Sequence, residues 1–205
     1  MSRKLLMQRL LAATPKAGIH LNKLTKKPGF ELDQTDWKRL AEANAAASLW
    51  IDDRSYQTTS TIRSTVRRHV QRHGNPDVVV IDYLGLLTPT NRAERRDLQL
   101  AEMTWALKIL ADELDLPIVV VHQLNRNATQ RPDKRPQLAD LRDSGAVEQD
   151  AFAVIAVHTP SVDDPDDTRA GESDLWILKH RQGQDGRITA AWQAHLGGLG
   201  DLTRR

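Results

Sequence analysis

The stretch Val78–Leu84, which reads V-V-V-I-D-Y-L, constrains the fold of this chain more than any other feature. A β-branched run between Gly74 and Gly85 predicts a strand that is buried on both faces, as in parallel sheets covered by helices. The run ends at a carboxylate, Asp82. Because ligands of open parallel sheets bind beyond the carboxyl ends of the strands, Asp82 is a candidate ligand for Mg²⁺ beside a nucleotide. The alternative is that Asp82 only caps the following turn.

The rest of the chain alternates between strand and helix patterns. Aliphatic runs predict further strands at residues 48–51, 117–121 and 151–157. Apolar residues at helical spacing predict helices at residues 3–13, 35–47 and 95–114, and another that starts near Thr58. A hairpin is expected from residues 175–178 and 188–192. This order predicts an α/β fold with a mostly parallel sheet flanked by helices and a C-terminal antiparallel hairpin.

Three finer expectations concern a core stripe on one helix, a surface loop and the C-terminal tail. In the helix at 35–47, Trp37, Leu40, Ala41 and Ala45 form the predicted core stripe. Residues 161–172 predict an acidic surface loop, and the tail from Gly197 is expected to be frayed.

Length and composition limit the class of protein. The 205 residues suffice for one sizeable domain, and 40% hydrophobic with 27% charged residues is the composition of a soluble globular protein. No apolar run approaches the ~20 residues that span a bilayer, and the absence of cysteine excludes disulfides and thiolate metal sites. We therefore expect a cytoplasmic protein without a membrane anchor. The net charge of +2 is too small to indicate a nucleic-acid partner, but the arginines are clustered.

A second polar group, His122-Gln123, follows the strand predicted at residues 117–121. If that strand neighbours the one that ends at Asp82, these side chains lie beside the same edge of the sheet. Gln123 can hydrogen-bond a phosphate or orient an attacking water. The alternatives are that Gln123 caps a loop and that His122 is a structural histidine rather than a general base.

A third group occupies the stretch from Asp140 to Asp150. Ser144 and Gly145 can expose backbone N–H groups at the start of a short helix, and Arg142 adds a cation, which suits phosphate binding. Upstream cations extend this positive surface, namely Arg126, Arg131, Lys134 and Arg135. Aromatic residues for base stacking are missing here, so contact with a nucleic acid would be to its backbone. A solvated loop is the alternative.

The fourth group is Lys179-His180-Arg181, at the end of a predicted strand. Lys179 and Arg181 are two positions apart and therefore point to the same side of the strand. Such a pair suits an arginine finger, which stabilises charge on a phosphate in a neighbouring subunit. The alternative is a pair of surface cations.

In this order the four groups resemble the C-terminal ATPase domain of DnaB-type replicative DNA helicases, hexameric motors with a RecA-like fold. V-V-V-I-D-Y-L is similar to the Walker B segment of that family, and residues 107–126 are similar to its following helix and sensor strand. Residues 135–151 resemble its DNA-facing motif, and K-H-R-Q-G at 179–183 resembles its trans-acting cation pair. The resemblance implies a partial RecA-like ATPase domain at residues 1–196 and a tail at 197–205.

The resemblance implies a role for each site residue. Asp82 would bind Mg²⁺, and Gln123 would sense the γ-phosphate of ATP and couple it to the DNA loop. Three residues would grip the backbone of single-stranded DNA, namely Arg142, Asp143 and Gly145. Lys179 and Arg181 would reach into the nucleotide site of the next subunit of a homo-hexamer. This chain departs from the family pattern with His122 in place of serine, Asp143 in place of glutamate and His180 in place of glutamine.

A larger departure concerns the phosphate loop, G-x-x-x-x-G-K-[ST], which occurs nowhere in this sequence. The resemblance places that loop, with the first strand and the glutamate that activates water, upstream of Met1. We therefore expect exposed sheet edges. We also expect the chain alone to bind ATP weakly and to hydrolyse it undetectably, unless partner subunits supply the missing loop.

The implied function is the C-terminal part of an ATP-dependent replicative DNA helicase, which unwinds duplex DNA by translocating on single strands. One alternative is a catalytically inactive remnant that serves as a single-stranded-DNA-binding or ring-interaction module. Another is a recombinase relative on the same RecA-like fold. The segment D-L-R-D-S-G-A-V-E-Q-D favours the helicase.

Overall fold

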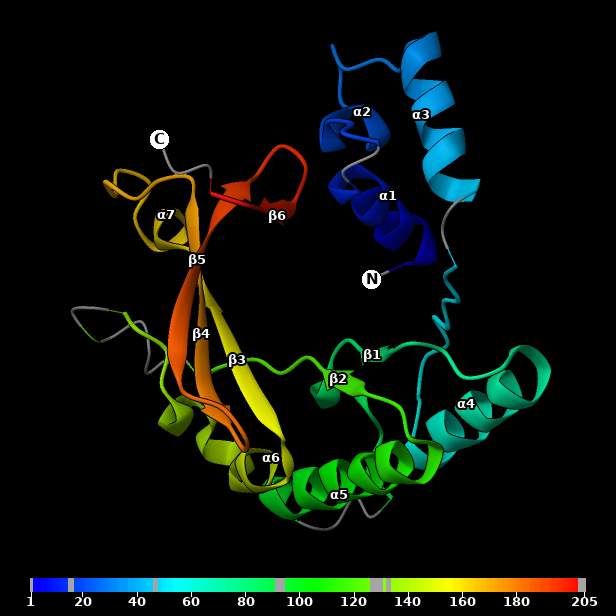
Figure 1. Cartoon of the computed structure of the whole chain (residues 1–205), viewed down its shortest axis with the longest axis vertical. Coiled ribbons are helices and arrows are strands. Elements are labelled where there is room, and N and C mark those ends of the chain that lie inside the picture. The colour runs from blue at the N-terminus through cyan, green and yellow to red at the C-terminus, as the bar shows by residue number, and fades with distance from the viewer. Residues whose placement is uncertain are drawn as a thin grey trace. The chain divides into compact units, whose positions relative to one another are not determined.

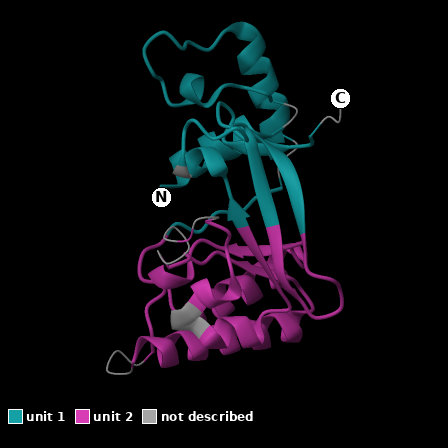
Figure 2. Ribbon diagram, turned by 90° about the vertical axis from the view of Figure 1, so that its left-hand side faces the viewer, with its two compact units in different colours: residues 1–53, 157–175, 187–205 teal, residues 54–156, 176–186 magenta. Residues whose placement is uncertain are grey.

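A computed structural model describes residues 2–14, 17–45, 48–90, 95–125, 131 and 134–202, with side chains at all of these positions except 142–144 and 163. The chain divides into two units (Figure 2). Unit 1 contains residues 1–53, 157–175 and 187–205, and unit 2 contains residues 54–156 and 176–186. Each unit has its own hydrophobic core and is described separately.

Unit 1 contains the N-terminal helices, as the sequence predicted. They are α1 (Arg3–Ala13), α2 (Leu21–Leu24) and α3 (Gln34–Ala45), with α7 (Pro160–Asp163) later in the chain (Figure 1). Ser2 caps α1 by accepting a hydrogen bond from the Leu5 N–H at 3.4 Å. The hydrophobic core of this unit contains Ala12, Ala17, Ile19, Leu24, Leu40 and Ala43. It is small, because three of these six side chains are alanines.

The predicted core stripe of α3 is wrong in part. Leu40 is buried, but Trp37 is 60% exposed, and the other buried positions are Asp36 and Ala43. The Lys23 ammonium lies 2.6 Å from the Asp36 carboxylate. This ion pair turns a charged side chain of α3 inward, which places Trp37 on the outer face of the helix.

Unit 2 begins with a helix whose start follows the predicted cap. In α4 (Thr59–His73), Thr58 and Thr61 form a reciprocal capping box. Then come β1 (Val79–Ile81), η1 (Leu84–Leu86), α5 (Arg96–Leu114), β2 (Ile118–Val120), η3 (Leu138–Ser144) and α6 (Gly145–Asp150). The core of unit 2 contains Ile81, Leu84, Leu87, Leu100, Met103 and Leu107. Arg63 and Arg67 of α4 both pair with Glu113 of α5 and tie these helices together.

Two sheets contain the strands. β1 and β2 are parallel, with Val79 opposite Ile118 and Ile81 opposite Val120. The second sheet has the order β3-β4-β5-β6 and contains β3 (Ala153–His158), β4 (Glu172–His180), β5 (Gly186–Gln193) and β6 (Gly198–Gly200). β4 and β5 are neighbours joined by five residues, which confirms the predicted hairpin. The tail was expected to be frayed, but β6 pairs with β5 in an antiparallel register through Trp192 and Leu199.

The prediction that the aliphatic strands are buried on both faces is wrong. Ile81 is 8% exposed and faces the core, whereas the alternate positions Val80 and Val119 are 59% and 49% exposed. On β3, Ile155 is 60% exposed. Helices α4 and α5 contribute Ile62, Leu100 and Met103 to the packing on one face of the β1–β2 sheet. The other face stays exposed in the part of the chain that the structure describes.

Residues 48–51 were predicted as a strand and are not one. They have no regular secondary structure and belong to neither sheet, and Trp50 is 57% exposed. A strand requires a hydrogen-bonded neighbour, and an aliphatic sequence alone does not provide one.

Candidate functional site

The carboxyl ends of β1 and β2 meet at one edge of the parallel sheet. The Val121 N–H donates to the carbonyl of Ile81 at 2.9 Å, and the Leu84 N–H donates to the carbonyl of Val121 at 2.9 Å. Asp82 leaves the sheet between these two bonds with an exposed carboxylate. Gln123 follows two residues after Val121. The structure therefore places Asp82 and Gln123 at adjacent strand ends, as the sequence predicted.

A pocket of about 250 Å³ lies in unit 2 at this edge. It is lined by Tyr83, Arg96, Leu100, His122, Gln123, Leu124, Asn125, Asp140 and Leu141. The Arg96 guanidinium donates to the carbonyl of Gly85 and to the Gln99 side chain, both at 3.3 Å, so it is held at the rim. The sequence singled out the stretches that contain Tyr83 and Asn125 without giving these two residues a role, and it missed Arg96, because nothing in the local pattern at the start of α5 points to the strand ends.

Asp140 is the buried anchor of this region, with 2% exposure. The Arg131 guanidinium donates to both of its carboxylate oxygens, at 2.9 and 2.6 Å, and the Gln137 N–H donates to one of them at 2.8 Å. The hydrogen bonds from Arg131 hold the pKa of the Asp140 carboxyl below its usual value despite burial. In addition, the Asn125 N–H donates to the carbonyl of Asp140 at 3.0 Å. Asp140 thus connects the segment after Gln123 to the start of η3.

The positive surface predicted upstream of η3 is therefore reduced. Arg131 neutralises Asp140 within the protein. The guanidinium of Arg135 lies 4.1 Å from the ring centroid of Trp176 on β4, a cation–π contact. Arg126 lies outside the described residues. Arg131 and Arg135 hold this segment against the rest of unit 2. These two cations therefore have structural contacts, although the sequence analysis assigned them to the positive surface.

The segment that resembles the DNA-facing motif of the family forms η3 and α6. The side chains of Arg142 and Asp143 lie outside what the structure describes, so their predicted roles stay predictions. Gly145 starts α6, in agreement with the predicted helix start. Its φ and ψ of −51° and −30° are helical, and a Cβ added there would meet nothing within 4 Å. Neither the backbone conformation nor the packing of this chain requires glycine at this position.

Lys179, near the end of β4, and Arg181, in the turn after it, both reach the carboxyl end of α6, in agreement with the prediction that the two cations point to the same side. The Lys179 ammonium donates to the carbonyls of Glu148 and Gln149. The Arg181 guanidinium donates to the carbonyl of Gln149 at 2.7 Å and reaches that of Asp150 at 3.5 Å. The predicted reach of these cations into a neighbouring subunit stays a prediction.

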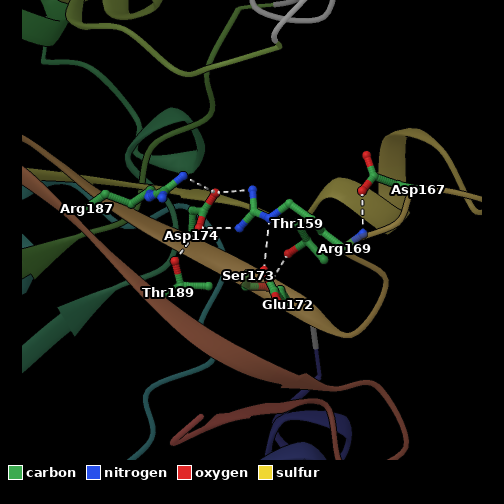
Figure 3. Close-up of polar contacts among 8 residues, drawn as sticks. All are labelled: Thr159, Asp167, Arg169, Glu172, Ser173, Asp174, Arg187 and Thr189. Carbon is green, nitrogen blue, oxygen red and sulfur yellow. Dashed lines mark hydrogen bonds and ion pairs between the residues drawn. The ribbon is translucent and has the colours of Figure 1, made fainter. Parts of the chain in front are cut away.

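Unit 1 contains a charged cluster that sequence reasoning missed. Figure 3 shows Asp174, which is 1% exposed, between Arg169 and Arg187. Arg169 donates to both Asp174 oxygens, at 2.8 and 2.7 Å, and the Thr189 hydroxyl donates at 2.9 Å. Burial raises the pKa of the Asp174 carboxyl, but these hydrogen bonds outweigh burial and hold that pKa below its usual value. The cluster fastens the loop before β4 to the sheet, so we assign it a structural role.

Among the described residues, no group of three or more histidine, aspartate or glutamate side chains is arranged to hold a metal ion. Within the same residues, no helix is long and apolar enough to cross a membrane.

Polar side chains at adjacent carboxyl ends of parallel strands, with helices packed on the sheet, are typical of ligand sites in open α/β folds, and the similar solved structures place this fold in the class of RecA-like ATPase domains. The comparisons identify the family. The family model of the DnaB-like helicase C-terminal domain matches residues 1–199 of the sequence, so this chain belongs to that family.

Curated relatives agree with this assignment. The replicative DNA helicase DnaB of Mycobacterium leprae is 42% identical over 207 residues, which cover 100% of this chain and 33% of the relative. The DnaB of Leifsonia xyli is 39% identical, over 98% of this chain and 44% of the relative. The chain thus spans between a third and a half of the length of these relatives.

Solved structures agree on the fold. One of them, a helicase ATPase domain, matches with a TM-score of 0.88 at 31% identity, over 99% of this chain and 72% of that one. A DnaB-like replicative helicase, studied with its interactions with primase, matches with a TM-score of 0.88 at 30% identity, over 99% of this chain and 50% of that one.

Proposed function

We propose that this chain is the nucleotide-sensing and strand-gripping part of an ATP-dependent replicative DNA helicase that translocates on single-stranded DNA. One observation carries the proposal. Asp82 and Gln123 leave adjacent, hydrogen-bonded strand ends, and two residues after Gln123 the Asn125 N–H bonds the carbonyl of Asp140 at 3.0 Å. A short backbone path therefore joins the edge that would face a nucleotide to η3, which would face DNA.

Asp82 and Gln123 suit an ATP–Mg²⁺ site. Mg²⁺ takes oxygen ligands and is usually held by one or two carboxylates together with substrate phosphates, and the exposed carboxylate of Asp82 fits one of these positions. Bound Mg²⁺ would neutralise charge on the β- and γ-phosphates. The exposed amide of Gln123 can donate a hydrogen bond to a phosphate oxygen and so distinguish a triphosphate from a diphosphate.

Because Gln123 is close in the chain to Asn125, a change in its position is passed to η3 through the Asn125–Asp140 bond. At the other end of η3, Arg142 would neutralise a DNA phosphate, Asp143 would lie on the same DNA-gripping loop, and Gly145 would let the DNA backbone approach closely. The open space around Gly145 supports this role. Lys179 and Arg181 would serve the nucleotide site of the next subunit in a homo-hexamer, and the protein would work in the cytoplasm.

The missing phosphate-loop motif limits what this chain does alone. Without the N–H groups and lysine of that loop, the β- and γ-phosphates lose their main anchors. We expect the 205-residue chain to show no ATP hydrolysis in a coupled assay with Mg²⁺, whether as wild type or as Asp82→Ala. Robust Mg²⁺-dependent turnover that disappears in Asp82→Ala would refute this expectation.

The test of the proposed function is binding of the chain to labelled single-stranded DNA at low salt, measured by fluorescence anisotropy. We expect the wild type to bind and Arg142→Ala to bind more weakly. The slope of log binding constant against log salt concentration should be smaller in magnitude for Arg142→Ala by about 0.7. The matched control is Arg68→Ala, an exposed arginine on α4 in the same unit. A wild type that does not bind, or equal losses in both variants, would contradict the strand-gripping role.

The second candidate is an inactive module that binds single-stranded DNA or joins a helicase ring made by complete subunits. The exposed face of the β1–β2 sheet, including Val80 and Val119, favours this candidate because an incompletely covered sheet can be completed by a partner. If the chain alone is inactive and ATP hydrolysis appears when it is mixed with a subunit that has the phosphate loop, the chain acts as the inactive module and not as a complete enzyme. The relatives reported above are replicative helicases, which gives the recombinase alternative no support.

A further inference from the structure

The cation pair on β4 is engaged within its own chain. Two donors, the Lys179 ammonium and the Arg181 guanidinium, hold three successive carbonyls, those of Glu148, Gln149 and Asp150. These are the last three residues of α6. Carbonyls in the last turn of a helix have no intrahelical partner and carry the negative end of the helix dipole, so cations placed there stabilise the end of the helix.

Helix α6 is short and has the DNA-facing segment directly at its other end. Its six residues correspond to a length of about 9 Å. Residue 144, the last of η3, directly precedes Gly145, the first of α6. A rigid helix of this length passes a shift of its carboxyl end to its amino end, because there is no loop between the helix and η3 to absorb it.

Other contacts also hold the carboxyl end of α6. The Thr104 hydroxyl of α5 donates to the Asp150 carboxylate at 2.6 Å, and the Arg181 N–H donates to the carbonyl of Phe152 at 3.0 Å. Thr104 ties the helix to α5, and the backbone bond ties the chain after α6 to the end of β4. Lys179 and Arg181 add the side-chain contacts that reach the carbonyls of the helix itself.

We propose that Lys179 and Arg181 are positioning residues for single-stranded DNA binding in their own chain, acting through α6 without touching the DNA. This inference rests on the proposed function of η3 and Gly145.

The test compares Lys179→Met and Arg181→Met in the 205-residue chain with Arg68→Met, a matched loss of charge on the exposed surface of α4. Hydrogen–deuterium exchange of a peptide covering residues 145–151 reports on α6. Anisotropy with labelled single-stranded DNA across a salt series reports on binding. Arg181→Lys and Lys179→Arg keep a cation at each position and should retain most of the binding.

We expect faster exchange in α6 and a roughly two- to fivefold loss of DNA affinity for each Met variant. The salt dependence should equal that of the wild type, because no DNA phosphate loses a partner. A fall in the log–log slope of about 0.7 would mean that the cation contacts DNA, and would overturn the inference. Faster exchange with unchanged affinity would overturn it too, since the pair would then be only structural.

The failure of this inference can be distinguished from the failure of the proposed function. If the wild type binds and Arg142→Ala weakens binding while both Met variants bind normally, only the positioning role is lost. If the wild type does not bind single-stranded DNA, both are refuted.

Discussion

Gly145→Ala should stabilise the protein and weaken its hold on DNA at the same time. The residue is exposed and starts α6 with φ −51° and ψ −30°, a conformation that alanine adopts without strain. The added Cβ meets nothing within 4 Å. Replacing glycine by alanine at a compatible position reduces the conformational entropy of the unfolded chain, so the free energy of unfolding should rise by about 0.4–1 kcal/mol.

DNA binding should change in the opposite direction. If a phosphate of the strand lies against the backbone of Gly145, a methyl group there displaces it and costs about one charge-assisted hydrogen bond, or roughly 1.5 kcal/mol, which is about tenfold in affinity. Urea unfolding measures the stability, and anisotropy with single-stranded DNA measures the affinity.

The matched control is Gly74→Ala. A Cβ at Gly74 would also meet nothing within 4 Å, but Gly74 has φ +84° and ψ 177°, a region that is essentially restricted to glycine. This variant should lose about 1–3 kcal/mol of stability. Loss of stability in Gly145→Ala, or unchanged DNA affinity in a stabilised Gly145→Ala, would refute the reasoning that glycine is present at 145 for an approaching strand.

Three further predictions concern stability and use urea unfolding. Asp174→Ala should cost about 2 kcal/mol, because it removes the buried carboxylate that accepts hydrogen bonds from Arg169 and Thr189, although Arg169 keeps its ion pair with Glu172; a loss below about 1 kcal/mol would contradict the anchoring role of the cluster. The Asp140 carboxyl has a lowered pKa in the folded state, so below pH of about 5 the unfolded chain binds more protons than the folded one. Stability contributed by Asp140 is therefore fully present at neutral pH and should decline as the pH falls toward about 3, and Asp140→Asn should flatten this decline. Val80→Lys on the exposed face should change stability by less than about 0.5 kcal/mol, whereas Ile81→Ala should cost about 2–5 kcal/mol; similar losses in both would mean that both faces of β1 are covered.

The order of helices and strands was predictable because it depends on local patterns. The Thr58 capping box, the aliphatic runs of β1 and β2 and the apolar spacing of α5 are each contained within a few turns or one strand. The adjacency of Asp82 and Gln123 followed from one further rule, that the carboxyl ends of parallel neighbours meet at one edge.

Errors arose where burial or pairing depends on distant parts of the chain. The aliphatic run around Val80 has the same sequence whether one or two faces of the sheet are covered, so the pattern did not reveal the exposed face. Residues 48–51 have strand propensity, but no sheet in the described structure includes them. Gly198–Gly200 has little propensity for a strand and forms one because β5 offers a pairing edge.

The sequence by itself determined the family and most of the element order, and it supplied the candidate site residues, because these are recorded in short motifs and local periodicity. Only the tertiary structure decided which cations are available to a ligand. Arg131 pairs with Asp140, Arg135 stacks on Trp176, and Lys179 reaches Glu148, 31 positions earlier in the chain. A guanidinium or ammonium group has the same sequence signature whether it binds a phosphate, a carboxylate or a helix end, and packing alone selects among these partners.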